Sequence, residues 1–212
     1  MHLFISIALC FIPLIVIILI ASLLIKELSK KSVFAGILAG FGAIIPISIA
    51  QYFLEPLNSF LGNSLTSVFI TALLFNGLIE EAIKMLFIFF IPGKNKRKST
   101  FFAVALIAGC TFGCFEAVVY LIAGSTNIST RLFTAVLLHT FCAGLSGIYI
   151  WTLKNTKAML SPFLLAVVLH GIYNFFAGFT NDFWWFSVIT IVFAIMQCRI
   201  YYTKIDESTI QN

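Results

Sequence analysis

The chain has 212 residues, of which 61% are hydrophobic and only 10% are charged, and its mean hydropathy is +1.07. A soluble domain of this length needs far more polar surface, so the composition excludes an ordinary soluble protein and indicates a membrane protein with several spans. The net charge is +5, but no basic cluster is interleaved with aromatic side chains as a nucleic-acid surface requires. We therefore expect the lipid bilayer as a partner, and no nucleic acid.

Seven apolar segments reach the length of about 20 residues that a helix needs to cross a bilayer. They cover residues 3–25, 33–54, 66–91, 100–123, 131–153, 158–179 and 183–202. These segments predict an all-α fold, a polytopic transmembrane helix bundle of about seven spans that forms a single membrane-embedded domain over residues 1–212. The first segment lacks a basic leader and is too long for the apolar part of a signal peptide, so we expect an uncleaved anchor.

The lysines and arginines between the segments predict the orientation of the chain. They follow the first, third and fifth segments and lie at the end of the seventh, and they comprise Lys26, Lys30, Lys31, Lys94, Lys96, Arg97, Lys98, Lys154, Lys157, Arg199 and Lys204. The opposite side receives only Arg131. With seven spans all of these clusters share one side, and the positive-inside rule then puts the C-terminus in the cytoplasm and the N-terminus outside.

Glycines and a proline interrupt the second segment, at Gly36, Gly40, Gly42 and Pro46. Small residues let two helices approach closely, and proline kinks a helix. We interpret this segment as a kinked, closely packed helix rather than as part of a substrate site.

The third segment carries three ionisable residues, Glu80, Glu81 and Lys84, at its centre. Glu80 lies four residues before Lys84 and Glu81 three before it, so on a helix both carboxylates can reach the ammonium group. One lysine neutralises only one carboxylate, and the other is then suited to act as a general base. An ion pair that only fixes helix packing is an equally good interpretation of these residues alone.

The fourth segment places Glu116 and Tyr120 on one helix face at four-residue spacing. Gly109 and Gly113 precede them and form a pair of small residues that lets another helix approach closely. Ionisable side chains inside a membrane usually face a bundle interior or water, so a functional site is the first hypothesis for Glu116. A hydrogen bond to a neighbouring helix is the alternative.

The fifth and sixth segments each carry one histidine. His139 is flanked on its helix face by the small residues Ala135, Ala143 and Ser146, which predicts that it lies at a helix junction. His170 and Asn174 are one turn apart on one face, and together they can donate hydrogen bonds to an oxyanion. A polar clasp between helices is the alternative for this second pair.

The depth of these residues in the membrane follows from their distance to the segment ends. Glu116, His139 and His170 lie seven to ten residues from the outer ends, or about 10–15 Å down a helix, so we expect them to meet in one layer. Glu80 is expected a turn or more deeper, and its convergence with the other three does not follow from the sequence.

Four polar elements, in this order on four successive segments, resemble the PrsW family of intramembrane proteases, which is related to the group of CAAX prenyl endopeptidases and bacteriocin-immunity (ABI) proteins. The family pattern is EExxK, FExxxY, a histidine, and HxxxN or HxxxD. It corresponds here to Glu80-Glu81-x-x-Lys84, Phe115-Glu116-x-x-x-Tyr120, His139 and His170-x-x-x-Asn174. The motifs fall in a core of about residues 66–179, and the spans in 1–54 and 183–202 are peripheral to it.

The resemblance implies that the chain hydrolyses a peptide bond within the membrane. Glu80 would activate a water molecule with help from Glu116. His170 and Asn174 would stabilise the oxyanion, while Glu81 and Lys84 would hold Glu80 in place. The expected catalytic residues are Glu80, Glu81, Glu116, His139, His170 and Asn174, with Lys84 and Tyr120 in support.

Whether a metal ion takes part stays open at this point. His139, His170 and Glu116 could hold zinc and leave one position open. The chain has no HExxH motif, however, and a metal-free glutamate mechanism needs the same residues.

The resemblance also implies a bacterial enzyme of the plasma membrane whose substrate is a single-span membrane protein, as in site-1 cleavage of anti-sigma factors. Two alternatives use the same buried polar residues, a non-catalytic membrane scaffold and an ion or proton transporter. The complete acid–base set disfavours the scaffold. The lack of two broken helices in corresponding halves of the sequence disfavours the transporter.

Overall fold

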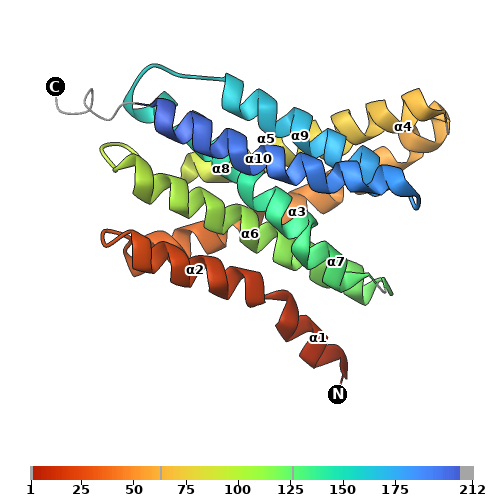
Figure 1. Cartoon of the computed structure of the whole chain (residues 1–212), viewed down its shortest axis with the longest axis horizontal. Helices are drawn as coiled ribbons and strands as arrows, with labels where there is room; N and C mark the ends of the chain where they lie inside the picture. The colour runs from red at the N-terminus through yellow and green to blue at the C-terminus, as the bar shows by residue number, and fades with distance from the viewer. Residues whose placement is uncertain (1, 63, 126, 206–212) are drawn as a thin grey trace.

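The computed structural model describes residues 2–62, 64–125 and 127–205, and within them the chain forms helices and no strand (Figure 1). The elements are α1 (His2–Cys10), α2 (Ile12–Leu24), α3 (Lys30–Leu61), α4 (Leu65–Thr71), the π-helix η1 (Ala72–Glu80), α5 (Glu81–Phe90), α6 (Lys98–Ile122), α7 (Ile128–Phe133), α8 (Ala135–Asn155), α9 (Ser161–Ala177), the short 3-10 helix η2 (Asp182–Trp184) and α10 (Trp185–Lys204). The fold is therefore all-helical, as predicted.

The helices follow one another as seven rods that correspond to the seven predicted segments. The largest difference is α3, which continues to Leu61 rather than ending at residue 54, with Pro46 and Pro56 inside it. Five rods are long and apolar enough to cross a membrane, namely Leu3–Leu24, Lys30–Leu54, Lys98–Ile122, Ile128–Asn155 and Asp182–Lys204. The rod Leu65–Phe90 contains the three ionisable residues, and α9 is a shorter apolar helix.

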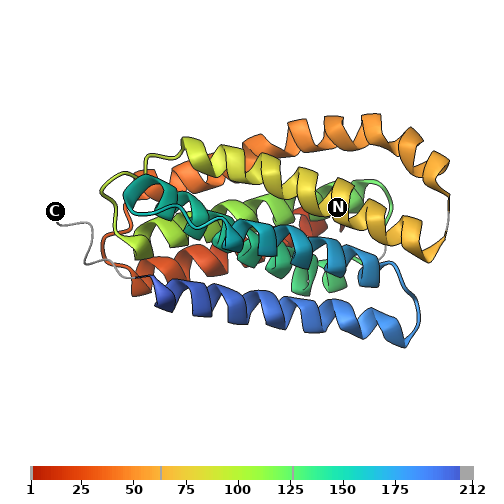
Figure 2. The same cartoon turned by 90° about the horizontal axis from the view of Figure 1, so that it is seen from above.

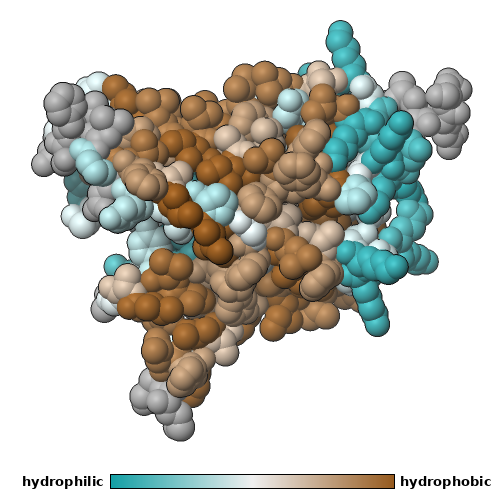
Figure 3. Space-filling model, turned by 180° about the vertical axis from the view of Figure 1, so that it is seen from behind, coloured by the Kyte–Doolittle hydropathy of each residue, from teal (hydrophilic) through white to brown (hydrophobic). Residues whose placement is uncertain are grey.

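The core of the bundle is formed by α6 and α8. In the 18-residue apolar stretches of the spans that contain α6 and α8, 67% and 78% of the residues are buried, compared with 11% in the corresponding stretch of α1 and α2. Figure 2 shows the rods running side by side along one direction, with α10 on the outside of the bundle. Apolar side chains cover most of the middle of the face shown in Figure 3, whereas the charged residues Glu80, Glu81 and Lys84 are buried inside the bundle.

Close helix packing at glycines determines how near the core helices come. A Cβ atom on Gly109 of α6 would lie 2.3 Å from the carbonyl oxygen of His139 on α8, and one on Gly40 of α3 would lie 2.2 Å from that of Ala108. Contacts this short are possible only for glycine, so the closely packed interfaces predicted for these glycines are confirmed.

The basic loops gather at one end of the bundle. The loops after α2, α5 and α8 and the end of α10 lie together (Figure 1), and hydrophilic side chains cover this end in Figure 3. Polar contacts join them, because Lys98 donates to the carbonyl oxygen of Ile205 (2.6 Å) and Asn155 to that of Gly93 (3.0 Å). The predicted placement of the basic clusters on one side is therefore found in the fold.

Candidate active site

Five buried polar side chains from three rods meet in the middle of the bundle. Glu80 ends η1, Glu81 and Lys84 lie on α5, His139 lies on α8, and His170 lies on α9. Each of these five side chains is buried, with Glu81 fully buried. Since a buried charge is costly unless it is paired and hydrogen-bonded, their contacts with one another decide whether the cluster can exist.

The π-helix η1 accounts for the position of Glu80. Hydrogen bonds from residue i to i+5 make this helix wider and shorter per residue than an α-helix, so Glu80 lies nearer the Leu65 end of its rod than α-helical spacing predicts. Close approach of η1 to α9 is possible because a Cβ on Gly77 would lie 2.6 Å from the carbonyl oxygen of Val167. As a result Glu80 Oε2 lies 3.6 Å from His170 Nε2. The sequence placed Glu80 a turn or more deeper than His170, but in the structure the two side chains are close together.

Glu81 is the centre of the hydrogen-bond network. Its Oε1 atom accepts from Lys84 Nζ at 2.5 Å and lies 2.7 Å from Nδ1 of His170. The expectation that Lys84 reaches both carboxylates is wrong, because among the described residues Lys84 forms an ion pair with Glu81 only. The side chain of Glu80 instead points toward α3 and α9.

Lys84 also fixes the orientation of the second histidine. Its Nζ atom lies 3.0 Å from His139 Nδ1, and Nε2 of the same ring lies 3.0 Å from Glu116 Oε2. A lysine ammonium group can only donate, so Nδ1 accepts and Nε2–H donates to Glu116. The two imidazole rings meet edge to face with their centroids 4.9 Å apart.

Glu80 receives a hydrogen bond that sequence reasoning did not find. Gln51 Nε2 on α3 donates to Glu80 Oε1 at 2.7 Å, whereas Oε2 is buried and has no hydrogen-bond partner among the described residues. Oε2 of Glu81 is also without a hydrogen bond, but Glu81 has the positive charge of Lys84 beside it. Gln51 is the only amide side chain in the predicted 33–54 segment, and this was the available signal.

Glu116 forms the outer edge of the cluster together with Arg131 of α7. Arg131 Nη2 donates to Glu116 Oε2 at 2.9 Å, and its guanidinium carbon lies 3.5 Å from the centroid of the Tyr120 ring. The predicted association of Tyr120 with Glu116 is thus mediated by Arg131, whose role was also missed. The glutamate side chain remains 20% exposed.

Asn174 lies outside the hydrogen-bond network. It is one turn beyond His170 on α9 and half-buried. Within the part of the chain that the structure describes, its side-chain amide has no hydrogen-bond partner.

Three side chains of the cluster suit a metal ion. Glu80, His139 and His170 each offer one ligand atom, and these atoms lie within 4.8 Å of one another. Two imidazoles and one carboxylate are a donor set of catalytic zinc sites with an open position, and the buried Glu80 Oε2 lacks the partner that a cation would provide. Glu81 on His170 Nδ1 is the outer-shell carboxylate that such histidines usually have. The donor types and their spacing therefore fit an ion, with Glu80 in the place where the sequence suggested Glu116. An ion bound to His139 would replace one of the contacts that this ring makes with Lys84 and Glu116.

The comparison with protein families agrees with this arrangement. A family model described as PrsW family intramembrane metalloprotease matches residues 29–198. This range includes α3 with Gln51 as well as all of the polar elements noted in the sequence. No curated protein and no solved structure matches the chain.

The buried ion pair leads to a prediction about stability. Lys84→Met should lower the free energy of unfolding by about 3–5 kcal/mol, because it leaves the Glu81 carboxylate buried without its cation. The double variant Glu81→Gln/Lys84→Met should be less destabilised than the sum of the two single variants. Unfolding in detergent, followed by circular dichroism, measures all three.

The exposed pair at the basic end provides the control. Arg97 Nη1 lies 2.7 Å from Glu27 Oε1, with both side chains more than half exposed. Glu27→Gln should therefore change the free energy of unfolding by less than about 1 kcal/mol. If Lys84→Met were as mild as Glu27→Gln, the described pairing would not be a structural requirement.

Proposed function

Because the chain belongs to the PrsW family of intramembrane metalloproteases, we propose that it hydrolyses a peptide bond of a membrane-anchored protein at the Glu80–His139–His170 cluster. One observation carries the assignment to these residues. Glu80 Oε2, a buried carboxylate oxygen without a hydrogen bond, faces an imidazole nitrogen at 3.6 Å. Such an oxygen is free to bind a water molecule or a cation. Glu81 Oε2 also lacks a hydrogen bond, but the Lys84 ammonium group neutralises that carboxylate, whereas Glu80 has no lysine or arginine partner among the described residues.

Glu80 is the proposed acceptor of the proton that water loses when it attacks the peptide carbonyl. Gln51 holds Oε1 in place, so Oε2 is the atom left to take the proton. His170 Nε2 lies beside it and can receive the proton in turn, because Nδ1 is held by the Glu81 carboxylate. This proton is then proposed to pass to the nitrogen of the leaving amine as the C–N bond breaks. Glu81 and Lys84 thus position the histidine rather than Glu80 itself.

The oxyanion formed on the substrate carbonyl needs hydrogen-bond donors. The side-chain amide of Asn174 has no hydrogen-bond partner among the described residues, so its N–H groups are available to a substrate. Protonated Nε2 of His170 is the second proposed donor. Glu116, fixed by Arg131 and His139, is proposed to assist in moving the proton at the open edge of the cluster.

The family description includes a metal, and the donor set fits one. An ion held by Glu80, His139 and His170 would polarise the attacking water and the carbonyl oxygen as a Lewis acid. With Glu80 engaged as a ligand, the partly exposed Glu116 carboxylate would be the proposed proton acceptor.

We extend this proposal to the substrate and to the orientation in the membrane. The cluster lies inside an apolar bundle, so the cleaved bond belongs to a segment that enters from the bilayer, as in a single-span protein of the anti-sigma-factor type. The basic end of the bundle is proposed to face the cytoplasm of a bacterial cell, with the N-terminus outside. The chain is then a seven-span plasma-membrane protein, and Arg131 marks its outer side.

Glu80→Gln tests the catalytic assignment. The substitution keeps the size of the side chain and removes the proton acceptor, so cleavage of a single-span substrate by the purified protein in detergent should fall by at least about 100-fold. The unfolding temperature should stay within a few degrees of the parent. Glu27→Gln is the matched control and should retain full activity.

The outcomes of this experiment separate the candidate functions. Undiminished cleavage by Glu80→Gln would exclude the proposed site. A variant that unfolds as well as losing activity would favour the scaffold interpretation of the same residues.

Metal dependence is tested by elemental analysis of the purified protein. We expect about one zinc-type ion per chain, lost in His139→Ala and in His170→Ala, and cleavage that stops with a chelator and returns with added metal. Full activity in metal-free protein would contradict metal dependence and favour the glutamate mechanism that uses no ion.

Reporter fusions test the orientation. Alkaline phosphatase, which is active only outside the cytoplasm, should be active when inserted after Gly124 and inactive when inserted after Lys94. The reverse pattern would contradict the proposed topology.

A further inference from the structure

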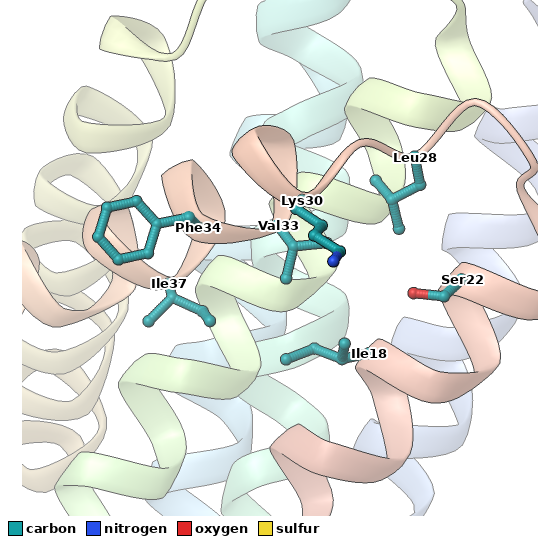
Figure 4. Close-up of a pocket in the computed structure, with 7 residues that line it drawn as sticks. All are labelled: Ile18, Ser22, Leu28, Lys30, Val33, Phe34 and Ile37. Carbon is teal, nitrogen blue, oxygen red and sulfur yellow. The ribbon is translucent and has the colours of Figure 1, made fainter.

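A groove of about 320 Å³ opens between α2 and α3 at the basic end of the bundle, away from the Glu80–His139–His170 cluster. Its lining residues are Ile18, Ser22, Leu28, Lys30, Val33, Phe34 and Ile37, and Figure 4 shows them on both sides of the space. All but two of these side chains are apolar. Phe34, at the rim, is 60% exposed.

The groove exists because α2 and α3 pack on the same central helix. Ile18, Val33 and Ile37 contact the buried cluster that includes Ile107 and Cys110 of α6. The two outer helices thus rest on α6 and leave a wedge between them, with α6 visible behind the sticks in Figure 4. An apolar wedge on a membrane-facing surface has to be filled by an apolar chain.

Two polar groups lie at this apolar groove, the Lys30 ammonium and the Ser22 hydroxyl. Figure 4 shows Lys30 Nζ directed into the space between the helices, with the Ser22 oxygen on the other side. Neither side chain has a hydrogen bond or ion pair with another described residue. The groove therefore combines apolar walls with a cation and a hydroxyl group that lack protein partners.

The surrounding charge is positive. Lys26 and Lys31 flank the groove in the sequence, and neither forms an ion pair within residues 2–62, 64–125 and 127–205. The nearby acidic residue is Glu27, whose Oε1 is engaged by Arg97. A ligand at this place thus meets uncompensated positive charge where the polar end of the bundle begins.

We propose that this groove binds one anionic phospholipid. Its acyl chain fills the wedge between α2 and α3, and its phosphate accepts hydrogen bonds from the Lys30 ammonium and the Ser22 hydroxyl. Juxtamembrane lysines attract anionic headgroups, and basic pockets between transmembrane helices bind them. The lipid would join α2 to α3, two helices that otherwise meet mainly through α6, and this role does not depend on the proposed proteolysis.

Native mass spectrometry of the detergent-purified chain tests the proposal. Dioleoylphosphatidylglycerol and dioleoylphosphatidylcholine differ in headgroup charge but share their acyl chains. We expect the parent to retain one phosphatidylglycerol about fivefold more tightly than phosphatidylcholine, since one lysine near a headgroup contributes roughly that factor. Added phosphatidylglycerol should also raise the unfolding temperature more than phosphatidylcholine does.

Lys30→Met keeps the apolar stem of the side chain and removes its charge. It should abolish the preference for phosphatidylglycerol and leave phosphatidylcholine retention unchanged. Lys157→Met removes an exposed lysine from another loop at the same end and should behave as the parent. Ser22→Trp fills the groove from its open side and should prevent retention of both lipids.

Several results would overturn the proposal. Equal retention of the two lipids by the parent, or an unchanged preference in Lys30→Met, would show that no headgroup is recognised here. A dimer that Ser22→Trp dissociates would assign the groove to a second copy of the chain. Because no substrate is cleaved in these measurements, none of the results bears on the proposed enzyme activity.

Discussion

The fully buried carboxylate of Glu81 is the constraint on which the centre of this protein depends. An unpaired ion in such a place costs several kcal/mol, and Glu81 is stabilised by Lys84 on its own helix and by His170 on α9. α5 and α9 therefore have to remain in register, and the glycine contact between η1 and α9 makes this possible. Through Lys84 the same constraint extends to His139 on α8, and from there to Glu116 on α6.

This network pairs two of its three carboxylates with a lysine or an arginine and leaves the third without such a partner. Glu81 and Glu116 each have a cationic partner within 3 Å, whereas Glu80 has an amide on one oxygen and an imidazole at 3.6 Å from the other. Adjacent residues in the sequence thus differ in their surroundings, and this difference is the basis for the proposed roles, with Glu81 in support and Glu80 in the chemistry. A carboxylate that is held but not saturated is preorganised for a reacting group.

Much of this arrangement could be predicted because membrane helices leave strong signals. Apolar length gave the seven rods, and the rarity of ionisable residues in them singled out Glu80, Glu81, Lys84 and Glu116. The sequence could not show which carboxylate forms the ion pair with Lys84, because spacings of three and four residues both permit it. It also could not show the π-helix, since its hydrogen bonds depend on tertiary packing rather than on composition. The contacts of Gln51 and Arg131 could not be predicted for a similar reason, because each acquires its role only through a partner on another helix.

Gln51 has a consequence for how small a working version of this protein can be. All of the motif residues lie between α4 and α9, so a fragment that begins after α3 would contain every one of them. Such a fragment would nevertheless lack the amide that holds Glu80 Oε1, and this oxygen would then face hydrocarbon. The minimal unit therefore starts before the first motif, on a helix that carries none of the signature residues.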